Sequence, residues 1–175
     1  EFELLCGVPA FEEMAGVEFN NFTGAAAYCM PGKLQVVGYQ TMASNAYNPS
    51  FFNTPNAYRG MGFGRMYFPR EYVSGSETYL VKGDTTGEMD FLFDSELFAQ
   101  NLEFITPFLR DKDGSPLFNY ILTVYGHLPH LLNEDKRPQV IKMHSKFKDP
   151  QLERVANQIY YRSEAIVRYV NRLIE

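Results

Sequence analysis

The sequence predicts a layered α/β domain, with a mainly parallel central sheet and helices on both faces. Three observations lead to this prediction. Short apolar runs alternate with helical patterns along the chain, which favours parallel strands joined by crossover helices. The run Leu117–Tyr125 is apolar, aromatic and β-branched, and it is typical of a strand buried on both faces. A long amphipathic helix is predicted from Asp149 to the end of the sequence.

Length and charge narrow the function classes. The chain has 175 residues, enough for one domain with a real core, and a formal net charge of -5 without a basic block. This charge argues against nucleic acid as a partner. There is no apolar run of eighteen residues and no signal-peptide pattern, so no membrane span is expected in this chain. The sequence begins without Met, so a processed or excised piece is expected.

The two cysteines, Cys6 and Cys29, leave two interpretations open. In an oxidising compartment they could form a disulfide that stabilises the fold by roughly 3 kcal/mol. The alternative, slightly favoured by the sequence, is a pair of buried thiols that act as small apolar side chains.

The first part of the chain predicts short elements. Glu1–Cys6 is interpreted as the end of a helix, because Gly7 is a good residue to follow one. A loop is predicted over Val8–Tyr28. Pro31–Gly38 predicts a short helix, with Pro in its first turn and Gly just past its end. Tyr39–Ser44 predicts the next strand.

The middle of the chain is rich in turn residues. Asn45–Asn56 predicts a loop, because Pro49 and Pro55 interrupt it, and Ala57–Met61 predicts a helical turn. Phe63–Phe68 predicts a short strand that Pro69 stops. A turn-rich connection is predicted over residues 74–87, around a strand at residues 78–81.

A helix and a strand follow. Asp94 predicts the N-cap of a helix over Ser95–Leu109, which Pro107 is expected to strain or end early. Leu117–Tyr125 predicts the next strand, which stops at Gly126. Because ligands bind just beyond the carboxyl ends of strands in open α/β sheets, His127 is a candidate active-site residue. The alternative is a histidine that only caps the strand.

The last helix has the clearest sequence pattern. Leu128–Lys148 predicts a polar connection, and Asp149-Pro150 predicts the start of the helix. Apolar residues then recur at helical spacing: Leu152, Val155, Ala156, Ile159, Tyr160, Ile166, Val167, Val170, Leu173 and Ile174. The charged residues on the other face are interpreted as solvated: Arg154, Arg162, Glu164, Arg168 and Arg172.

Common catalytic motifs are absent from the sequence. There is no P-loop, no dinucleotide-binding glycine fingerprint, no C-x-x-C and no H-E-x-x-H. His127, His130 and His144 are poor zinc candidates, because Pro129 separates the first two and no cysteine accompanies them. Acidic pairs such as Glu12-Glu13 lie in polar turns and are interpreted as solvated.

Several short segments together carry a resemblance to a known family. They are Glu1-Phe2-Glu3 with Leu5, Gly7 and Pro9; Gly38–Thr41; Phe51-Phe52-Asn53; Asn56–Arg59 with Gly62-Phe63; and Leu122–Pro129, followed by the helix from Asp149. The chain resembles enzymes of the lipoteichoic-acid-synthase type, in the sulfatase/alkaline phosphatase superfamily. These include phosphoglycerol and phosphoethanolamine transferases. The resemblance covers the chain as a single, incomplete sulfatase-like catalytic domain over residues 1–175.

The resemblance implies a metal-assisted transfer from a lipid or glycan phosphodiester. A Thr or Ser coordinated to Mn, Mg or Zn would attack the phosphorus, with His127 as the active-site histidine. Asn45, Tyr47 and Asn53 would bind substrate. The nucleophile and the metal ligands would lie outside this chain, so no metal is expected in it. The parent would be a bacterial membrane-anchored protein whose domain is extracytoplasmic, either periplasmic or extracellular.

Departures from the family pattern leave other functions open. Many relatives have a His where Asn45 stands and an Arg where Thr54 stands. A Thr hydroxyl cannot replace a bidentate arginine clamp on phosphate. The alternative is therefore a non-catalytic binding relative, in which Asn45, Tyr47 and Asn53 bond only their own loop backbone. A further possibility is a part that forms a homo-oligomer, because missing strands would leave sheet edges to be covered.

Overall fold

The computed structural model describes residues 1–7, 9, 28–72, 91–110, 114–144, 146 and 148–175. Most of the loop predicted before Tyr28 and the strand predicted at residues 78–81 lie outside the described residues. The chain divides into two compact units. Unit 1 comprises Glu1–Phe68 and Ile105–Leu122, and unit 2 comprises Pro69–Phe104 and Thr123–Glu175.

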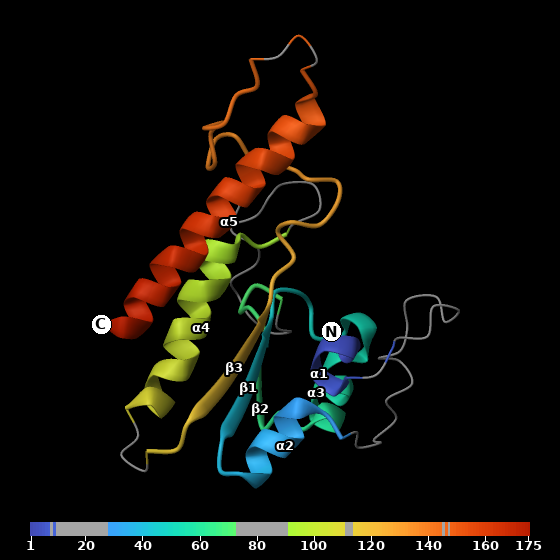
Figure 1. The fold of residues 1–175 in the computed structure, drawn as a ribbon, viewed down its shortest axis with the longest axis vertical. Helices are drawn as coiled ribbons and strands as arrows, with labels where there is room; N and C mark the ends of the chain where they lie inside the picture. Colours follow the sequence, from blue (N-terminus) through green and yellow to red (C-terminus); the bar gives the residue numbers. More distant parts are fainter. Residues whose placement is uncertain (8, 10–27, 73–90, 111–113, 145, 147) are drawn as a thin grey trace. The chain divides into compact units, whose positions relative to one another are not determined.

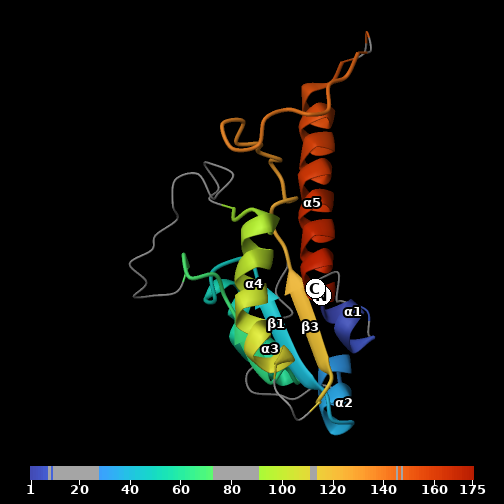
Figure 2. The same ribbon diagram turned by 90° about the vertical axis from the view of Figure 1, so that its left-hand side faces the viewer.

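Unit 1 is built on a three-stranded parallel sheet, as the sequence predicted. Strand β1 (Gln40–Asn45) lies between β2 (Arg65–Tyr67) and β3 (Leu117–Leu122). Both views show β1 and β3 side by side (Figures 1 and 2). The central strand is buried from Thr41 to Asn45.

The prediction for β3 was wrong in two respects. The strand ends at Leu122 rather than Tyr125, and all six of its residues are half-buried rather than buried on both faces. In the described sheet β3 pairs with β1 only, so it is an edge strand. An apolar run cannot by itself distinguish a central strand from an edge strand, because pairing is decided by the rest of the fold.

Short helices cover one face of this sheet (Figure 1). They are α1 (Phe2–Cys6), α2 (Met30–Val36) and α3 (Thr54–Met61), and a 3₁₀ turn, η2 (Phe51–Asn53), precedes α3. The buried core between helices and sheet consists of Leu5, Cys29, Ala43, Ala57, Tyr58, Met61 and Phe63. The helices predicted to end at residue 6 and to begin near residue 31 are thus confirmed.

The loop predicted over Asn45–Asn56 is only partly correct. Helix α3 already begins at Thr54, because Pro55 lies in its first turn, where its fixed φ suits a helix. The helix ends at Gly62, which has φ of 93°. A Cβ on Gly62 would lie 2.4 Å from the Cα of Gly32, so α2 and α3 meet backbone to backbone at two glycines.

Cys6 and Cys29 form a disulfide, which corrects the slight preference for free thiols. The bond joins the last residue of α1 to the residue before α2, and Cys29 is fully buried. Sequence could not decide this point, because two cysteines 23 residues apart pair only if the fold brings them together.

Unit 2 contains the first part of α4 (Asp94–Leu109), whose last turn lies in unit 1, and the whole of α5 (Pro150–Ile174). Pro107 lies inside α4, which continues to Leu109, so the proline does not end the helix early. Asp149 caps α5 as predicted, because its Oδ1 accepts hydrogen bonds from the backbone N–H of Gln151 and Leu152, at 2.8 and 3.3 Å.

Helix α5 buries polar residues and exposes apolar ones, contrary to the usual expectation. Glu153, Asn157 and Gln158 are almost fully buried. Most of the predicted apolar face is exposed: Leu152, Ile159, Tyr160, Ile166, Val167, Val170, Leu173 and Ile174. The buried polar side chains bond the polar backbone of residues 131–143, which packs on this face. Periodicity shows which residues share a face, but not which face is packed.

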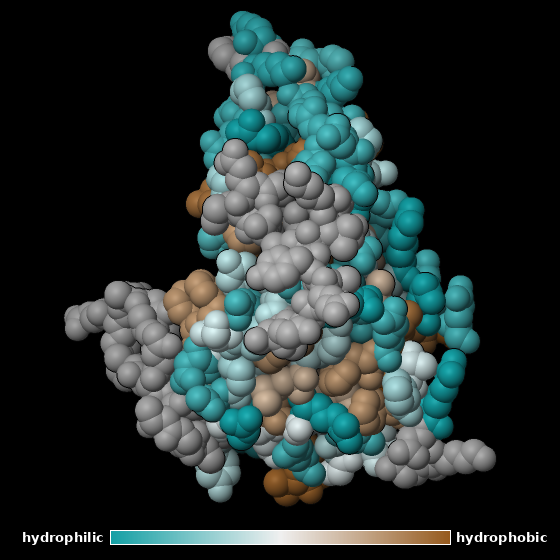
Figure 3. Space-filling view, turned by 180° about the vertical axis from the view of Figure 1, so that it is seen from behind, coloured by the Kyte–Doolittle hydropathy of each residue, from teal (hydrophilic) through white to brown (hydrophobic). Residues whose placement is uncertain are grey.

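Apolar side chains therefore remain on the surface of the described residues. On the side drawn in Figure 3, hydrophilic residues prevail and hydrophobic residues gather in the lower part of the view. No described helix is both long and apolar enough to span a bilayer.

Candidate functional site

The segment that follows β3 carries the candidate histidine. The backbone N–H of His127 donates to the carbonyl of Val124 at 2.9 Å, and the N–H of His130 donates to the carbonyl of His127 at 3.2 Å. Two successive turns thus place His127 on a tight loop. Tyr125, 1% exposed, holds the base of the loop by packing edge-on against Phe93, with ring centroids 5.1 Å apart.

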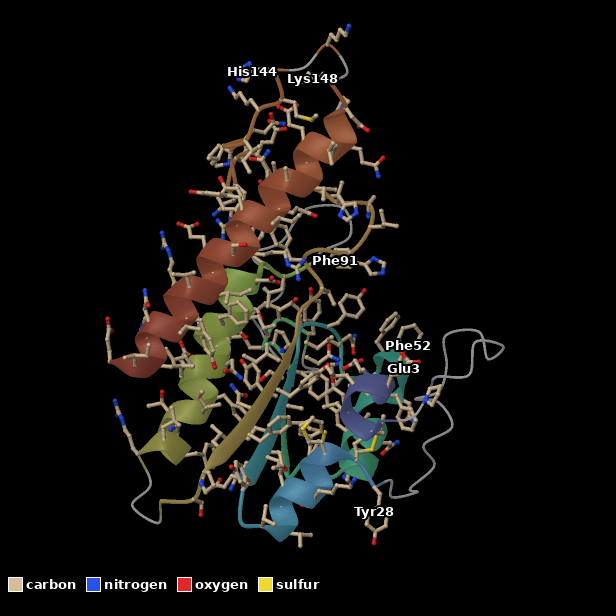
Figure 4. The ribbon with its side chains drawn as sticks, viewed as in Figure 1. Glu3, Tyr28, Phe52, Phe91, His144 and Lys148 are labelled. Carbon is tan, nitrogen blue, oxygen red and sulfur yellow. A yellow bond between two sulfur atoms is a disulfide. The ribbon has the colours of Figure 1, made fainter. Side chains whose placement is uncertain are left out.

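The His127 side chain is exposed, and the backbone carbonyl of the next residue fixes its tautomer. The ring Nδ1 lies 2.8 Å from the carbonyl oxygen of Leu128. A carbonyl can only accept, so Nδ1 carries the proton, and in the neutral ring Nε2 keeps its lone pair. The ring also meets the side chain of Phe91 edge-on, at 5.7 Å between ring centroids; Phe91 is labelled in Figure 4. His127 is thus oriented and accessible, as a residue that binds or protonates a ligand oxygen must be.

Helix α5 supports this loop through Arg162. The guanidinium Nε donates to Asp94 Oδ2 at 3.0 Å, and NH2 donates to the Thr123 hydroxyl at 3.4 Å. A Cβ on Gly126 would lie 2.3 Å from Arg162 NH1, so only glycine lets the loop pass this close to the guanidinium. The prediction that Arg162 is solvated is only partly correct, because its side chain is 38% exposed but forms an ion pair with a buried carboxylate.

Asp94 is the buried partner of this ion pair. Its side chain is 2% exposed, and burial raises the pKa of the carboxyl group above its ordinary value. The hydrogen bond and charge of Arg162, together with the N–H of Tyr125, act in the opposite direction. Burial also raises the pKa of Tyr125 to about 12. Asp94 and Tyr125 are structural supports of the loop, since neither is exposed like His127.

The other candidate residues, Asn45, Tyr47 and Asn53, lie in unit 1. Asn45 ends β1 and is 6% exposed. Its Oδ1 accepts from the backbone N–H of Tyr47 at 3.0 Å, and its Nδ2 donates to the Tyr58 hydroxyl at 3.3 Å. Asn45 and Tyr47 are thus held together at the carboxyl end of β1.

Tyr47 and Asn53 belong to the segment before α3. The half-buried Tyr47 ring packs edge-on against Phe51, with centroids 5.0 Å apart. Asn53 precedes α3 with φ of 52°, a left-handed conformation that Asn tolerates better than most residues. Its Oδ1 accepts from Asn56 Nδ2 at 2.7 Å. Asn45 thus makes one of the loop-backbone hydrogen bonds that the alternative expects, whereas the bonds of Asn45 to Tyr58 and of Asn53 to Asn56 join side chains.

Thr54 occupies the position at which the family pattern has an arginine. Its side chain is buried at 3% exposure, and its hydroxyl donates to the carbonyl of Phe51 at 2.6 Å. The hydroxyl therefore closes the turn before α3. Phe51 and Phe52 are both about half exposed, at 47%, and Figure 4 labels Phe52.

A carboxylate–tyrosine cluster beside Asn45, in which Tyr58 is the buried member, was missed at the level of sequence. The Tyr58 hydroxyl donates to Glu1 Oε1 at 2.6 Å, and the Tyr120 hydroxyl donates to the same atom at 3.3 Å. Burial raises the pKa of Glu1, and burial beside Glu1 raises that of Tyr58. No local signal could reveal this cluster, because its members come from three distant segments.

The candidate residues belong to two different units. Asn45, Tyr47 and Asn53 belong to unit 1, and His127 belongs to unit 2. A cavity of about 350 Å³ in unit 1 is lined by the first residues of β1 and by Arg65 at the start of β2. It lies at the amino ends of these strands, so it does not include Asn45.

The described residues do not supply a metal site. They contain no group of three or more His, Cys, Asp or Glu side chains that could hold an ion. A divalent ion would supply neutralisation of phosphoryl charge. The ligands of such an ion would have to come from residues other than the described ones.

Comparison with solved structures places the fold. Lipoteichoic acid synthase LtaP from Listeria monocytogenes has a TM-score of 0.71 at 19% identity, over 89% of this chain and 35% of that one. An alkaline phosphatase superfamily protein from Vibrio parahaemolyticus has a TM-score of 0.60 at 17% identity, over 95% of this chain and 36% of that one. The Streptococcus pyogenes phosphoglycerol transferase GacH, in complex with sn-glycerol-1-phosphate, has a TM-score of 0.64 at 18% identity, over 98% of this chain and 43% of that one.

These similarities define a class of fold. The chain has the α/β fold of alkaline phosphatase superfamily proteins, which include phosphoglycerol transferases, as the sequence resemblance predicted. It spans between about a third and two-fifths of the length of each of these chains. No protein-family model matches the sequence, and no curated protein matches it.

Proposed function

We propose that this chain is part of a metal-dependent hydrolase or transferase of the sulfatase type, acting on phosphodiesters. The donor would be a lipid that carries phosphoglycerol or phosphoethanolamine, and the acceptor a glycan or water. The observation that carries the proposal is the exposed imidazole of His127, which its own loop holds in one tautomer. The fold, similar to that of phosphoglycerol transferases, supports the choice of substrate class.

His127 would act on the phosphoryl or head group. Its Nε2 could accept a hydrogen bond from a ligand hydroxyl, or, when protonated, donate one to a phosphoryl oxygen. Asn45, Tyr47 and Asn53 remain proposed substrate-binding residues. The nucleophile and the ion-binding carboxylates would come from the rest of a longer protein.

The Cys6–Cys29 disulfide supports the proposed location. Disulfides persist in oxidising compartments and are rare in the bacterial cytosol. The proposed setting is therefore the outer side of a bacterial membrane, in a membrane-anchored parent.

A binding experiment tests the role of His127. The 175-residue chain would be titrated with sn-glycerol-1-phosphate, and His127→Ala would be compared with His144→Ala, a matched loss of an exposed imidazole elsewhere in unit 2. We expect only His127→Ala to weaken binding, by about tenfold, the value of one charge-assisted hydrogen bond. Equal affinity of the two variants would contradict the assignment.

The buried position of Thr54 favours a second candidate function, a non-catalytic binding module of the same fold. Without an arginine clamp, the site would bind a head group but stabilise phosphoryl charge poorly. Turnover of a phosphodiester by the longer parent with added Mn²⁺ separates the two functions. Metal-dependent turnover supports the enzyme, and binding without turnover supports the module.

A further inference from the structure

A buried glutamine on α5 lies directly beneath the loop that carries His127. Gln158 is 2% exposed, so its amide group is removed from solvent. Its Nε2 donates to the carbonyl oxygens of Tyr125 and Leu131, at 3.1 and 2.8 Å. Its Oε1 lies 2.9 Å from the Nδ1 of His130. One side chain therefore bonds three residues of the loop.

The orientation of this amide is fixed by chemistry. The carbonyls of Tyr125 and Leu131 can only accept, so the NH₂ group of Gln158 must face them. The amide oxygen consequently faces His130, whose Nδ1 must carry the proton that this oxygen accepts. A buried amide with these partners holds one arrangement, because any flip would leave buried polar groups without hydrogen bonds.

The three residues that Gln158 bonds lie on both sides of His127 in the sequence. Tyr125 comes before it, and His130 and Leu131 come after it. His130 itself has φ of 59°, an uncommon left-handed conformation for a residue other than glycine. Its ring bonds Gln158, and its backbone N–H donates to the carbonyl of His127 at 3.2 Å, so His130 links the buried amide to the residue that carries the candidate ring.

We propose that Gln158 is a positioning residue, which orients the imidazole of His127 toward a phosphate ester. The inference rests on the proposed function, in which His127 contacts the ligand. Gln158 itself is too deeply buried to contact a ligand and acts only through the loop. Arg162, one helical turn further along α5, bonds Thr123 and contacts Gly126, so the two side chains share the support of this segment.

The test compares two substitutions of the same chemical type on α5. Gln158→Met keeps the approximate length of the side chain and removes all three hydrogen bonds. Gln151→Met makes the same change at an exposed position in the first turn. For each chain, ¹⁵N spectra of the histidine rings would report the tautomer of His127, and titration with sn-glycerol-1-phosphate would report affinity.

We expect Gln158→Met to mix the two tautomers of His127 and to weaken binding about tenfold, as supporting residues of a site commonly do. Gln151→Met should leave both measurements unchanged. A Gln158→Met chain with an unchanged His127 ring and unchanged affinity would overturn the proposal. A merely structural role would lower stability without changing the ring tautomer of the folded chain.

A milder variant covers the case in which Gln158→Met does not fold. His130→Phe keeps both backbone bonds of Gln158 and removes only the side-chain bond to Oε1. A smaller change of the His127 tautomer in the same direction supports the proposal, and no change opposes it. If His127→Ala binds the ligand as tightly as the unmodified chain, the proposed function fails. The ring spectra still decide whether Gln158 positions the imidazole.

Discussion

Asn157 offers the sharpest test of how α5 is held in unit 2. The residue is fully buried and uses its whole amide group. Its Oδ1 accepts from the backbone N–H of Val140 and Ile141, at 2.7 and 2.9 Å. Its Nδ2 donates to the carbonyls of Ile141 and Glu153, both at 2.8 Å. Asn157→Leu preserves the volume and removes all four bonds.

The expected cost follows from these partners. The carbonyl of Glu153 lies within the helix, so losing its hydrogen bond from Asn157 costs little free energy. The two N–H groups and the Ile141 carbonyl lose their partner, at about 1 kcal/mol or more each where water cannot replace it. Because the side chains of Val140 and Ile141 are partly exposed, water can reach some of these groups. We expect a net loss of about 2–4 kcal/mol in the free energy of unfolding.

Urea denaturation followed by circular dichroism measures this loss, and hydrogen exchange measures the two backbone amides directly. Asn171→Leu, the same change at an exposed position of α5, is the control and should cost less than about 0.5 kcal/mol. A loss below about 1 kcal/mol for Asn157→Leu, with the amides of Val140 and Ile141 still protected, would refute the reasoning.

Three further predictions concern other parts of the chain. Replacing both cysteines by serine should lower the free energy of unfolding by about 3 kcal/mol, because the disulfide joins residues 23 apart in the sequence. A reductant should destabilise the original chain but not the serine variant. Equal urea midpoints for the two oxidised chains would contradict this prediction. Burial holds the pKa of Asp94 above its ordinary 3.8, so the folded state binds a proton more tightly than the unfolded state. Its contribution should fall as pH rises from 3.8 through the raised pKa, and Asp94→Asn should remove that slope from a pH series of urea midpoints. The exposed apolar face of α5 should make the isolated chain self-associate. In light scattering, the double variant Ile159→Glu, Ile166→Glu should be a monomer, whereas the control Arg172→Glu should still associate. An unmodified chain that is monomeric at every concentration would exclude this contact.

The sequence by itself determined the local elements and the class of fold. Pro and Gly marked the limits of α2, and Asp149-Pro150 marked the start of α5, because capping and fixed φ act within a few neighbouring residues. The pattern of apolar runs was enough to predict a parallel sheet. The position of His127 beyond a strand could also be predicted, but the strand ends at Leu122, because an apolar run does not mark the residue at which pairing stops.

Tertiary structure alone decided which surfaces and side chains meet. The pairing of Cys6 with Cys29, the polar buried face of α5 and the three bonds of Gln158 all join residues far apart in the chain. A glutamine in a helix gives no sign of whether it faces water or a loop. That choice depends on which segment packs against it, and the packing is settled by the burial and hydrogen bonding of the whole unit.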